Sequence, residues 1–193
     1  TVVDADDLMS NLVNNAKKIS QDLGKTKGKG QNEIDSLYEM VGLGALKYFI
    51  LKVDPHKNML FNTEESIDFN GNTGPFIQYT FARIQSLLRN CDYQLLLDFQ
   101  DDYKLNSFEK NLIKIMCQFP NILSDSAKQL NPSLLANYSY ELSKEFNQFY
   151  QSYSILNNKS KNITILRLVI SKKISEIIKS SMSLLGILMP DKM

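Results

Sequence analysis

Three residues near the middle of the chain carry side chains that stack on flat ligands. Phe76, Tyr79 and Arg83 are spaced by three and four residues, so they share one face of any helix that contains them. Aromatic rings and guanidinium planes are the usual platforms for unpaired RNA bases. The same residue types are enriched at protein–protein interfaces, and they also pack against a further helix within a bundle. The spacing alone leaves these three explanations open.

Other reactive side chains form no recognisable catalytic or metal-binding pattern. The single histidine, His56, follows a proline in a predicted turn, and general acid–base catalysis needs a partner within reach. Cys91 and Cys117 lack the spacing of metal ligands. The stretch GKTKGKG, residues 24–30, lacks the spacing of a phosphate-binding loop, so we interpret it as a solvated basic loop that could touch a phosphate backbone. We therefore predict no catalytic residue and no metal site.

A second stripe on the same segment predicts the helix that positions Phe76, Tyr79 and Arg83. This stripe is apolar and has helical spacing; it consists of Ile77, Phe81, Ile84 and Leu88. An apolar face of a soluble helix is normally buried against other elements. We expect this stripe to lie in a core, at roughly 100° or more from the aromatic face.

Helical periodicity extends over most of the remaining chain. It predicts helices over about 6–23, 33–48, 107–119, 131–153 and 162–185. Asn131 followed by Pro132 is typical of a helix start, and Gly186 is typical of the residue after a helix end. Pro120 is expected to interrupt the helix that begins near Ser107.

Two short segments favour β-strands, and both lie before residue 60. Residues 1–4 are rich in β-branched side chains, and residues 49–54 alternate in polarity. The predicted fold class is therefore mainly α, a helical bundle preceded by a small mixed α/β segment that ends near Phe61.

Composition is that of a globular chain. The 193 residues are 43% apolar with a net charge of +1, which gives no overall attraction to nucleic acid. Residues 143–193, however, hold eight Lys or Arg against three Asp or Glu, a net charge of +5. These basic side chains either lie along the phosphates of a nucleic acid or only keep the last helix solvated. No apolar run approaches the roughly 18 residues of a membrane span. Two cysteines define no disulfide framework, so we expect a reducing, intracellular setting.

Several motifs together resemble the arginyl-tRNA synthetase family. The segment FNGNTGPFIQYTFARIQSLLRN, residues 69–90, is similar to the family pattern F-x-G-N-T-[AG]-P-[YF]-x-Q-Y-x-x-A-R-x-x-S-[IL]-[LF]-R. VGLGALKYFIL, LLANYSYELSKEFNQFY and the ending SLLGILMPDKM also resemble family segments, in the family's order and over nearly the whole chain. TVVDADDLM is similar to the piece that follows the family's ATP-site lysine signature.

The resemblance implies a particular domain organisation and reaction. Residues 1–61 would be a linking segment from the end of the catalytic core, and residues 70–193 the helical DALR anticodon-binding domain. The parent enzyme would charge tRNA(Arg) with arginine using ATP and Mg. Neither nucleotide-binding signature of the family occurs in this chain, and its first residue is threonine, so we expect a piece of that enzyme that holds no cofactor and is inactive alone. The implied setting is a cytoplasmic monomer that binds tRNA(Arg), without DNA or a membrane as partner.

The resemblance also implies which residues meet RNA. The family's aromatic pair, here Phe76 and Tyr79, approaches the anticodon bases, Arg83 adds a cationic plane or a phosphate contact, and the chain end at Met193 lies close by. Asn137 and Lys144, which lie off the apolar stripe of their helix, are further candidates, whereas Asn72 is expected to cap a helix. The alternative function is a helical protein-interaction module that uses the same aromatic face, and the salt dependence of binding separates the two.

Overall fold

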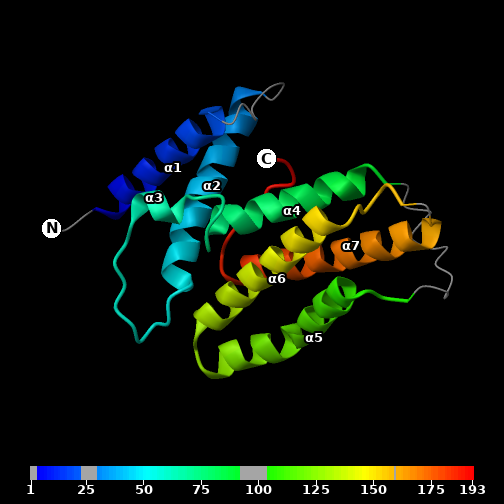
Figure 1. Cartoon of the computed structure of the whole chain (residues 1–193). Helices are drawn as coiled ribbons and strands as arrows, with labels where there is room; N and C mark the ends of the chain where they lie inside the picture. Colours follow the sequence, from blue (N-terminus) through cyan, green and yellow to red (C-terminus); the bar gives the residue numbers. More distant parts are fainter. Residues whose placement is uncertain (1–3, 23–29, 92–103, 159) are drawn as a thin grey trace.

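The computed structural model describes residues 4–22, 30–91, 104–158 and 160–193. Within these ranges the regular structure is entirely helical, without a strand (Figure 1). The helices are α1 (Ala5–Asp22), α2 (Gln31–Leu51), α3 (Thr63–Ser66), α4 (Gly74–Arg89), α5 (Ser107–Lys128), α6 (Pro132–Ser152) and α7 (Lys161–Leu184). The predicted helical bundle is confirmed.

The strand predicted over residues 49–54 is wrong. Phe49 to Leu51 form the last turn of α2, and the Lys52 N–H donates to the Tyr48 carbonyl at 2.9 Å. Ala45, Tyr48 and Phe49 are all buried, at the spacing of one helical face. Helical packing of this face therefore overrides the β-branched composition. Of the other predicted strand, residues 1–3 lie outside the described residues, and Asp4 precedes α1.

Pro120 does not interrupt α5, so this prediction was also wrong. The proline is exposed inside a helix that runs from Ser107 to Lys128. An internal proline typically costs about 3 kcal/mol, and the half-buried side chains of α5 that pack on the core offset it. The helix begins with a capping box in which Asn106 accepts from the Glu109 N–H and the Glu109 carboxylate accepts from the Asn106 N–H.

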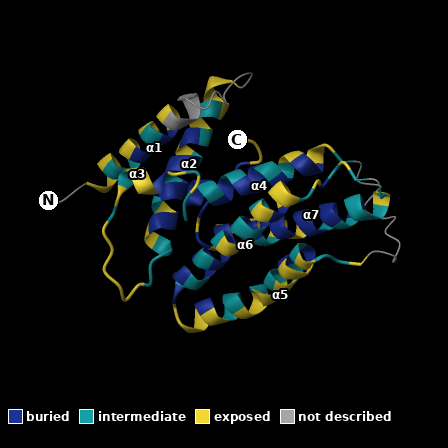
Figure 2. Ribbon diagram, in the orientation of Figure 1, coloured by how far each residue is buried: buried dark blue, intermediate teal, exposed yellow. Residues whose placement is uncertain are grey.

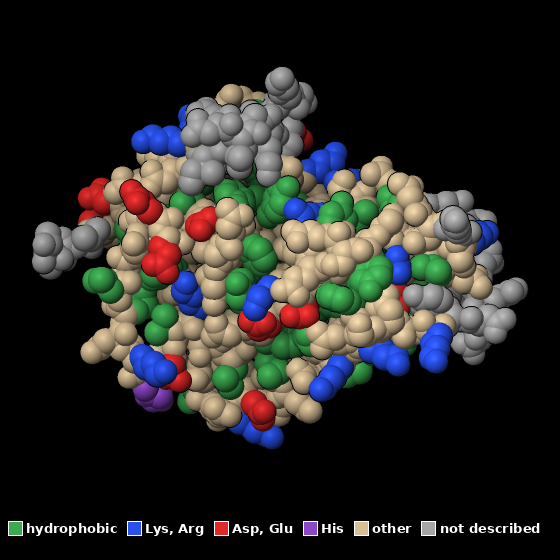
Figure 3. All heavy atoms as spheres, in the orientation of Figure 1, with side chains coloured by type: hydrophobic (Ala, Val, Ile, Leu, Met, Phe, Trp, Pro, Cys, Tyr) green, Lys and Arg blue, Asp and Glu red, His purple; other side chains and the backbone are tan. Residues whose placement is uncertain are grey.

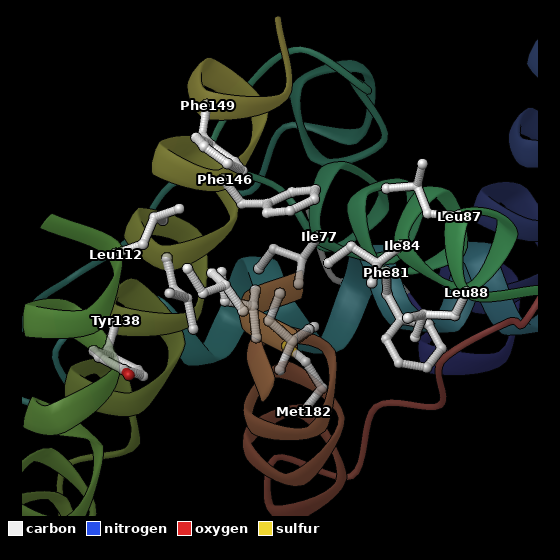
Figure 4. Packing of buried hydrophobic residues seen from close by; sticks show 14 of the residues in the cluster. Ile77, Phe81, Ile84, Leu87, Leu88, Leu112, Tyr138, Phe146, Phe149 and Met182 are labelled. Carbon is white, nitrogen blue, oxygen red and sulfur yellow. The ribbon is translucent and has the colours of Figure 1, made fainter. Parts of the chain in front are cut away.

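The predicted apolar stripe of α4 lies in the core of the bundle. Ile77, Phe81, Ile84 and Leu88 are each no more than 5% exposed. They meet α6 and α7, whose facing sides are buried as well (Figure 2). Figure 4 shows Phe146 of α6 pointing toward Ile77 of α4. On α7 the buried apolar residues are Ile165, Leu168, Ile170, Ile174, Ile178 and Met182, and α4, α5 and α6 all pack on this helix.

Helix α2 joins α1 to the bundle through close backbone approaches. A Cβ atom added at Gly42 would lie 2.8 Å from the backbone of Val13 in α1. A Cβ at Gly74, the first residue of α4, would lie 2.5 Å from the carbonyl oxygen of Gly44 in α2. Glycine therefore permits α1 and α4 to contact α2 on two sides. The first approach accounts for glycine at position 42 and the second for glycine at position 74.

The chain leaves α7 through Gly186, as predicted, and returns over the bundle. Gly186 has a φ of 69°, and the Ile187 N–H donates to the Met182 carbonyl at 2.8 Å, which closes the helix end. Residues 187–193 then run back toward α2 and α4, so the C-terminus lies beside α4 (Figure 1). None of the described helices combines the length and apolar character of a membrane span.

Candidate nucleic-acid interface

The start of α4 is set by Thr73 and not by Asn72, which corrects the predicted cap. The Thr73 hydroxyl accepts from the Phe76 N–H at 3.2 Å and donates to the Asp68 carbonyl. Asn72 instead accepts from the Tyr48 hydroxyl at 2.6 Å. These bonds fix the start of α4, where Phe76 packs at the margin of the core.

The two aromatic residues of α4 are half-buried. The Phe76 ring lies 5.4 Å from the ring of Tyr140 on α6, centroid to centroid. The Tyr79 ring meets Phe69 edge-on at 6.3 Å. Both rings therefore have a protein neighbour on one side while part of each remains accessible to solvent, as a stacking platform requires.

Arg83 lies between α4 and α6 and is held in place from several directions. Its Cζ is 4.8 Å from the ring centroid of Tyr79 and 5.0 Å from that of Tyr150. Its guanidinium also donates to the side-chain oxygen of Asn147, whose amide donates to the Thr80 hydroxyl at 2.7 Å. Contacts with two rings and an amide fix the guanidinium plane before any ligand binds.

A pocket of about 610 Å³ opens beside these residues. Its walls come from the second half of α4, the end of α6, the segment after α6 and the C-terminus; they are formed by Tyr79, Ala82, Arg83, Ser86, Leu87, Arg89, Asn90, Tyr150, Leu156, Lys192 and Met193. Among the described residues, the lining thus combines two tyrosine rings with three cationic side chains. Figure 3 shows hydrophobic side chains beside Lys and Arg over the face where α6 crosses α4, with Asp and Glu side chains further along α6.

Three of the six predicted RNA-contact residues, Tyr79, Arg83 and Met193, line this pocket. Phe76 precedes Tyr79 by one turn on the same face of α4 and extends it. Met193 is half-buried and also packs on the small apolar cluster between α1 and α2. The structure therefore places the end of the chain against the aromatic face, from which it is separated by more than a hundred residues.

Lys144 and Asn137 do not line the pocket. Lys144 lies on α6, one turn after Tyr140, where it pairs with Glu141 at 3.6 Å. The Asn137 amide donates to the carbonyls of Lys52 at 2.9 Å and Ser133 at 2.8 Å, and its oxygen accepts from Asn72 at 3.3 Å. Its hydrogen bonds therefore tie α6 to the end of α2.

Sequence reasoning missed Tyr140, Tyr150 and Arg89. Tyr140, Lys144, Asn147 and Tyr150 recur every three or four residues on α6, a polar and aromatic stripe of the kind that was recognised on α4. That stripe was available as a signal. Arg89 also had a signal, because the family pattern of residues 69–90 includes an arginine at this position. In the structure its guanidinium donates to the Asp191 carbonyl at 2.9 Å.

The arrangement is suited to binding and not to covalent chemistry. Rings and a guanidinium plane can stack on bases, and Arg89 and Lys192 can neutralise phosphates. Within the described part of the chain no group of three or more His, Cys, Asp or Glu could hold a metal ion. Burial lowers the pKa of Lys52, whose ammonium donates to the Asn72 carbonyl at 2.9 Å, but this contact holds the turn before α4 and lies outside the pocket.

Comparisons with known proteins agree with this geometry. Residues 77–193 match the family model of the DALR anticodon binding domain. The chain is 49% identical over its whole length to an arginine–tRNA ligase of Flavobacterium psychrophilum and 48% identical to one of Phocaeicola vulgatus. It spans about a third of the length of these curated relatives, 32% in both cases.

Solved structures show the same fold. The chain superposes over its full length on an arginyl-tRNA synthetase from Plasmodium falciparum, with a TM-score of 0.87 and 28% identity, and covers 34% of that chain. It also superposes on the Thermus thermophilus arginyl-tRNA synthetase with a TM-score of 0.90 at 24% identity, covering 32% of that chain; at this identity the likeness shows the fold alone. The family model covers well over half of the residues, and the chain belongs to the DALR anticodon-binding domain family.

Proposed function

We propose that this chain binds the anticodon loop of tRNA(Arg) as the anticodon-binding part of an arginine–tRNA ligase. The observation that carries the proposal is the pocket of Tyr79, Arg83, Arg89, Tyr150, Lys192 and Met193, which combines two tyrosine side chains with three cations. Family membership and the relatives that are arginine–tRNA ligases support the choice of RNA.

The size of the pocket suits a nucleobase that has left its stack. Its volume of about 610 Å³ lies in the range of roughly 300–1,000 Å³ for small-ligand sites. Stacking of an unpaired base on an aromatic ring contributes about 1–3 kcal/mol. Phe76 and Tyr79, a turn apart on α4, would provide successive stacking positions leading into the pocket.

Electrostatics favour an anionic ligand at this site in a chain that is nearly neutral as a whole. Three cationic side chains, Arg83, Arg89 and Lys192, line the pocket. A ligand that places phosphates near these groups releases counterions, so its binding weakens as salt rises. Because the whole chain has a net charge of only +1, this attraction for anions is confined to the surroundings of the pocket.

The proposal extends to the parent enzyme. We propose residues 1–61 as a segment that links this domain to a catalytic core, and residues 70–193 as the anticodon-binding domain. Charging of tRNA(Arg) with arginine would use ATP and Mg at sites formed by other parts of the enzyme, which would act as a cytoplasmic monomer. Asn137 and Lys144 remain proposed contacts at the margin of the RNA.

The test is a binding titration with an RNA hairpin of the tRNA(Arg) anticodon arm. The comparison ligand is the same stem closed by a stable tetraloop, which offers the phosphates but not the unpaired anticodon bases. We expect tighter binding of the anticodon hairpin and a steep loss of affinity between 50 and 200 mM salt, on the order of tenfold or more. Equal binding of both hairpins would contradict anticodon recognition. No RNA binding, with salt-insensitive capture of a protein partner, would favour the protein-interaction alternative.

A further inference from the structure

The C-terminal tail, residues 185–193, forms one wall of the pocket, and three side chains hold it by its backbone. Lys47 of α2 donates to the Gly186 carbonyl at 2.7 Å, Gln78 of α4 donates to the Leu188 carbonyl at 2.8 Å, and Arg89 donates to the Asp191 carbonyl at 2.9 Å. The three acceptors are main-chain atoms spread over most of the tail. These contacts therefore do not depend on the side chains of the tail itself.

Gln78 is the central contact and is fully buried. Its amide nitrogen also donates to the Met40 carbonyl at 3.1 Å, so one side chain joins α4 to α2 and to the tail. Its side-chain oxygen is buried without a hydrogen-bond partner. A buried acceptor without a hydrogen-bond partner is unfavourable. A methionine of similar shape at this position would avoid that cost. Compared with methionine, the Gln78 amide contributes two hydrogen bonds, which it donates to the carbonyls of Met40 and Leu188.

Neighbouring residues make room for this amide. A Cβ atom at Gly44 would lie 2.6 Å from the Gln78 amide nitrogen, so a larger residue there would force the amide to move. Ile187 is buried beside it, whereas Leu188 is 68% exposed. The middle of the tail is thus held by the buried Ile187 and Pro190, by Met189, which packs on the core, and by the Gln78 amide. The last two residues, Lys192 and Met193, line the pocket.

We propose that Lys47 and Gln78 are positioning residues for RNA binding, which act by holding the C-terminal tail as a wall of the pocket. This inference rests on the proposed function. Neither residue lines the pocket, so neither is placed to touch RNA there. Both act through the tail, whose last two residues meet Tyr79 and Arg83 across the site. Arg89 also holds the tail, but it lines the pocket as well. A substitution of Arg89 would therefore not distinguish positioning of the tail from direct contact with RNA.

The experiment combines hydrogen exchange with RNA titration in this chain. Gln78→Met keeps the length of the side chain and removes its donors, and Lys47→Met removes the exposed ammonium at Gly186. Lys17→Met, at an exposed position on α1, is the matched control for the loss of a positive charge. Without RNA, we expect amide exchange in residues 187–193 to accelerate in both variants by about fivefold to tenfold, and not in the control. The affinity for the anticodon hairpin should fall by a similar factor.

A deletion of residues 192–193 separates positioning from a general loss of stability. In the otherwise unchanged chain the deletion should lower RNA affinity. In the Gln78→Met background it should have little further effect, because the tail has already left the site. A mutation that merely destabilised the fold would leave the effect of the deletion intact. Urea denaturation confirms that each variant is folded at the assay temperature.

Each outcome decides the proposal. Faster tail exchange together with weaker RNA binding and a non-additive deletion supports it. Unchanged tail exchange in both variants overturns it, as does a released tail with unaltered RNA affinity, and in that case the proposed function survives. If the unchanged chain does not bind the hairpin, the proposed function fails first, and the positioning role falls with it.

Discussion

The guanidinium of Arg83 lies over the ring of Tyr79, with 4.8 Å between Cζ and the ring centroid. The two residues are one turn apart on α4, and Tyr150 on α6 approaches the same guanidinium at 5.0 Å. One cation thereby connects the two helices that border the pocket. A charged group held by two rings and an amide oxygen is pre-organised, so little conformational entropy remains to be lost when a ligand binds.

Removal of the aromatic rings should weaken RNA binding while the fold persists. For Tyr79→Ala we expect an affinity loss of about 1–3 kcal/mol, the usual value for one stacked base. Phe76→Ala should show a similar loss and also a lower melting temperature, because Phe76 packs on Tyr140. The measurements are titration with the anticodon hairpin and far-ultraviolet circular dichroism.

The matched control for these rings is Phe119→Ala. Phe119 is a half-buried aromatic residue on α5 that stacks on Tyr138 and lies outside the pocket. It should leave RNA affinity unchanged. Loss of helicity in both Tyr79→Ala and Phe76→Ala would instead assign these rings to the structural core.

Substitutions of Arg83 should distinguish how much its planar guanidinium and its positive charge each contribute to RNA affinity. Arg83→Lys keeps the charge but loses the flat, forked guanidinium, so affinity should fall several-fold while the salt dependence is retained. Arg83→Met should lower affinity further and reduce the slope of log K against log salt by about one if a phosphate is contacted. Titrations at four salt concentrations measure both effects. Lys128→Met, at the exposed end of α5, is the control. If Arg83→Lys binds RNA as tightly as the unchanged chain, the planar guanidinium has no role in binding.

The buried ion pair between Arg167 and Glu109 should be essential for stability. Arg167 Nε lies 2.9 Å from Glu109 Oε1, and the two residues are 6% and 0% exposed. Glu109→Ala leaves a buried guanidinium without its counter-ion, which should lower the free energy of unfolding by about 3–5 kcal/mol. Urea denaturation measures the loss.

An exposed pair in the same chain provides the control for this prediction. Lys173 and Glu176 lie 2.7 Å apart on the surface of α7, and Lys173→Ala should cost no more than about 1 kcal/mol. The combined Glu109→Met, Arg167→Met variant should be less destabilised than the sum of the single changes, because no charge is left unpaired. Strict additivity would mean that the two charges act independently.

Stability should decline in alkaline solution because two tyrosines are held neutral. Burial, aided by Tyr140 and Glu141, raises the pKa of Tyr48 well above its ordinary value of 10.0, and burial raises the pKa of Tyr138 to about 12. A raised folded-state pKa means that this stabilisation is complete below about pH 10 and is lost as pH rises toward the folded pKa. For Tyr48 the slope approaches about 1.4 kcal/mol per pH unit, and the more exposed Tyr138 contributes less.

Denaturation by urea at several pH values between 8 and 11.5 tests this expectation. Tyr48→Phe loses the hydroxyl bonds to Asn72 and to the Ala136 carbonyl, so it should be less stable at pH 8. Its stability should nevertheless decline less steeply above pH 10. Parallel curves for the two proteins would show that Tyr48 does not ionise on unfolding in this range.

Local patterns in the sequence determined the helices and the face that each one buries. The stripe Ile77, Phe81, Ile84 and Leu88 is predictable because burial follows helical periodicity, and the start at Asn131 because its side chain accepts from the Ser133 N–H at 3.0 Å. The family motifs and helix positions led to six candidate residues, of which Tyr79, Arg83 and Met193 line one pocket while Phe76, Asn137 and Lys144 do not. Such features depend on residues a few positions apart or on similarity to known chains.

Only the tertiary structure decided where α2 ends, that α5 passes through Pro120, and how the pocket is assembled. Packing of Tyr48 and Phe49 in the core outweighs a weak strand preference, and the contacts of α5 with the core outweigh the cost of an internal proline. The pocket depends on contacts between residues far apart in the chain, such as Gln78 with Leu188 and Arg89 with Asp191. Every residue has a main-chain carbonyl, so a hydrogen bond to that group does not depend on the residue type of the acceptor. Such contacts therefore cannot be predicted from a sequence pattern.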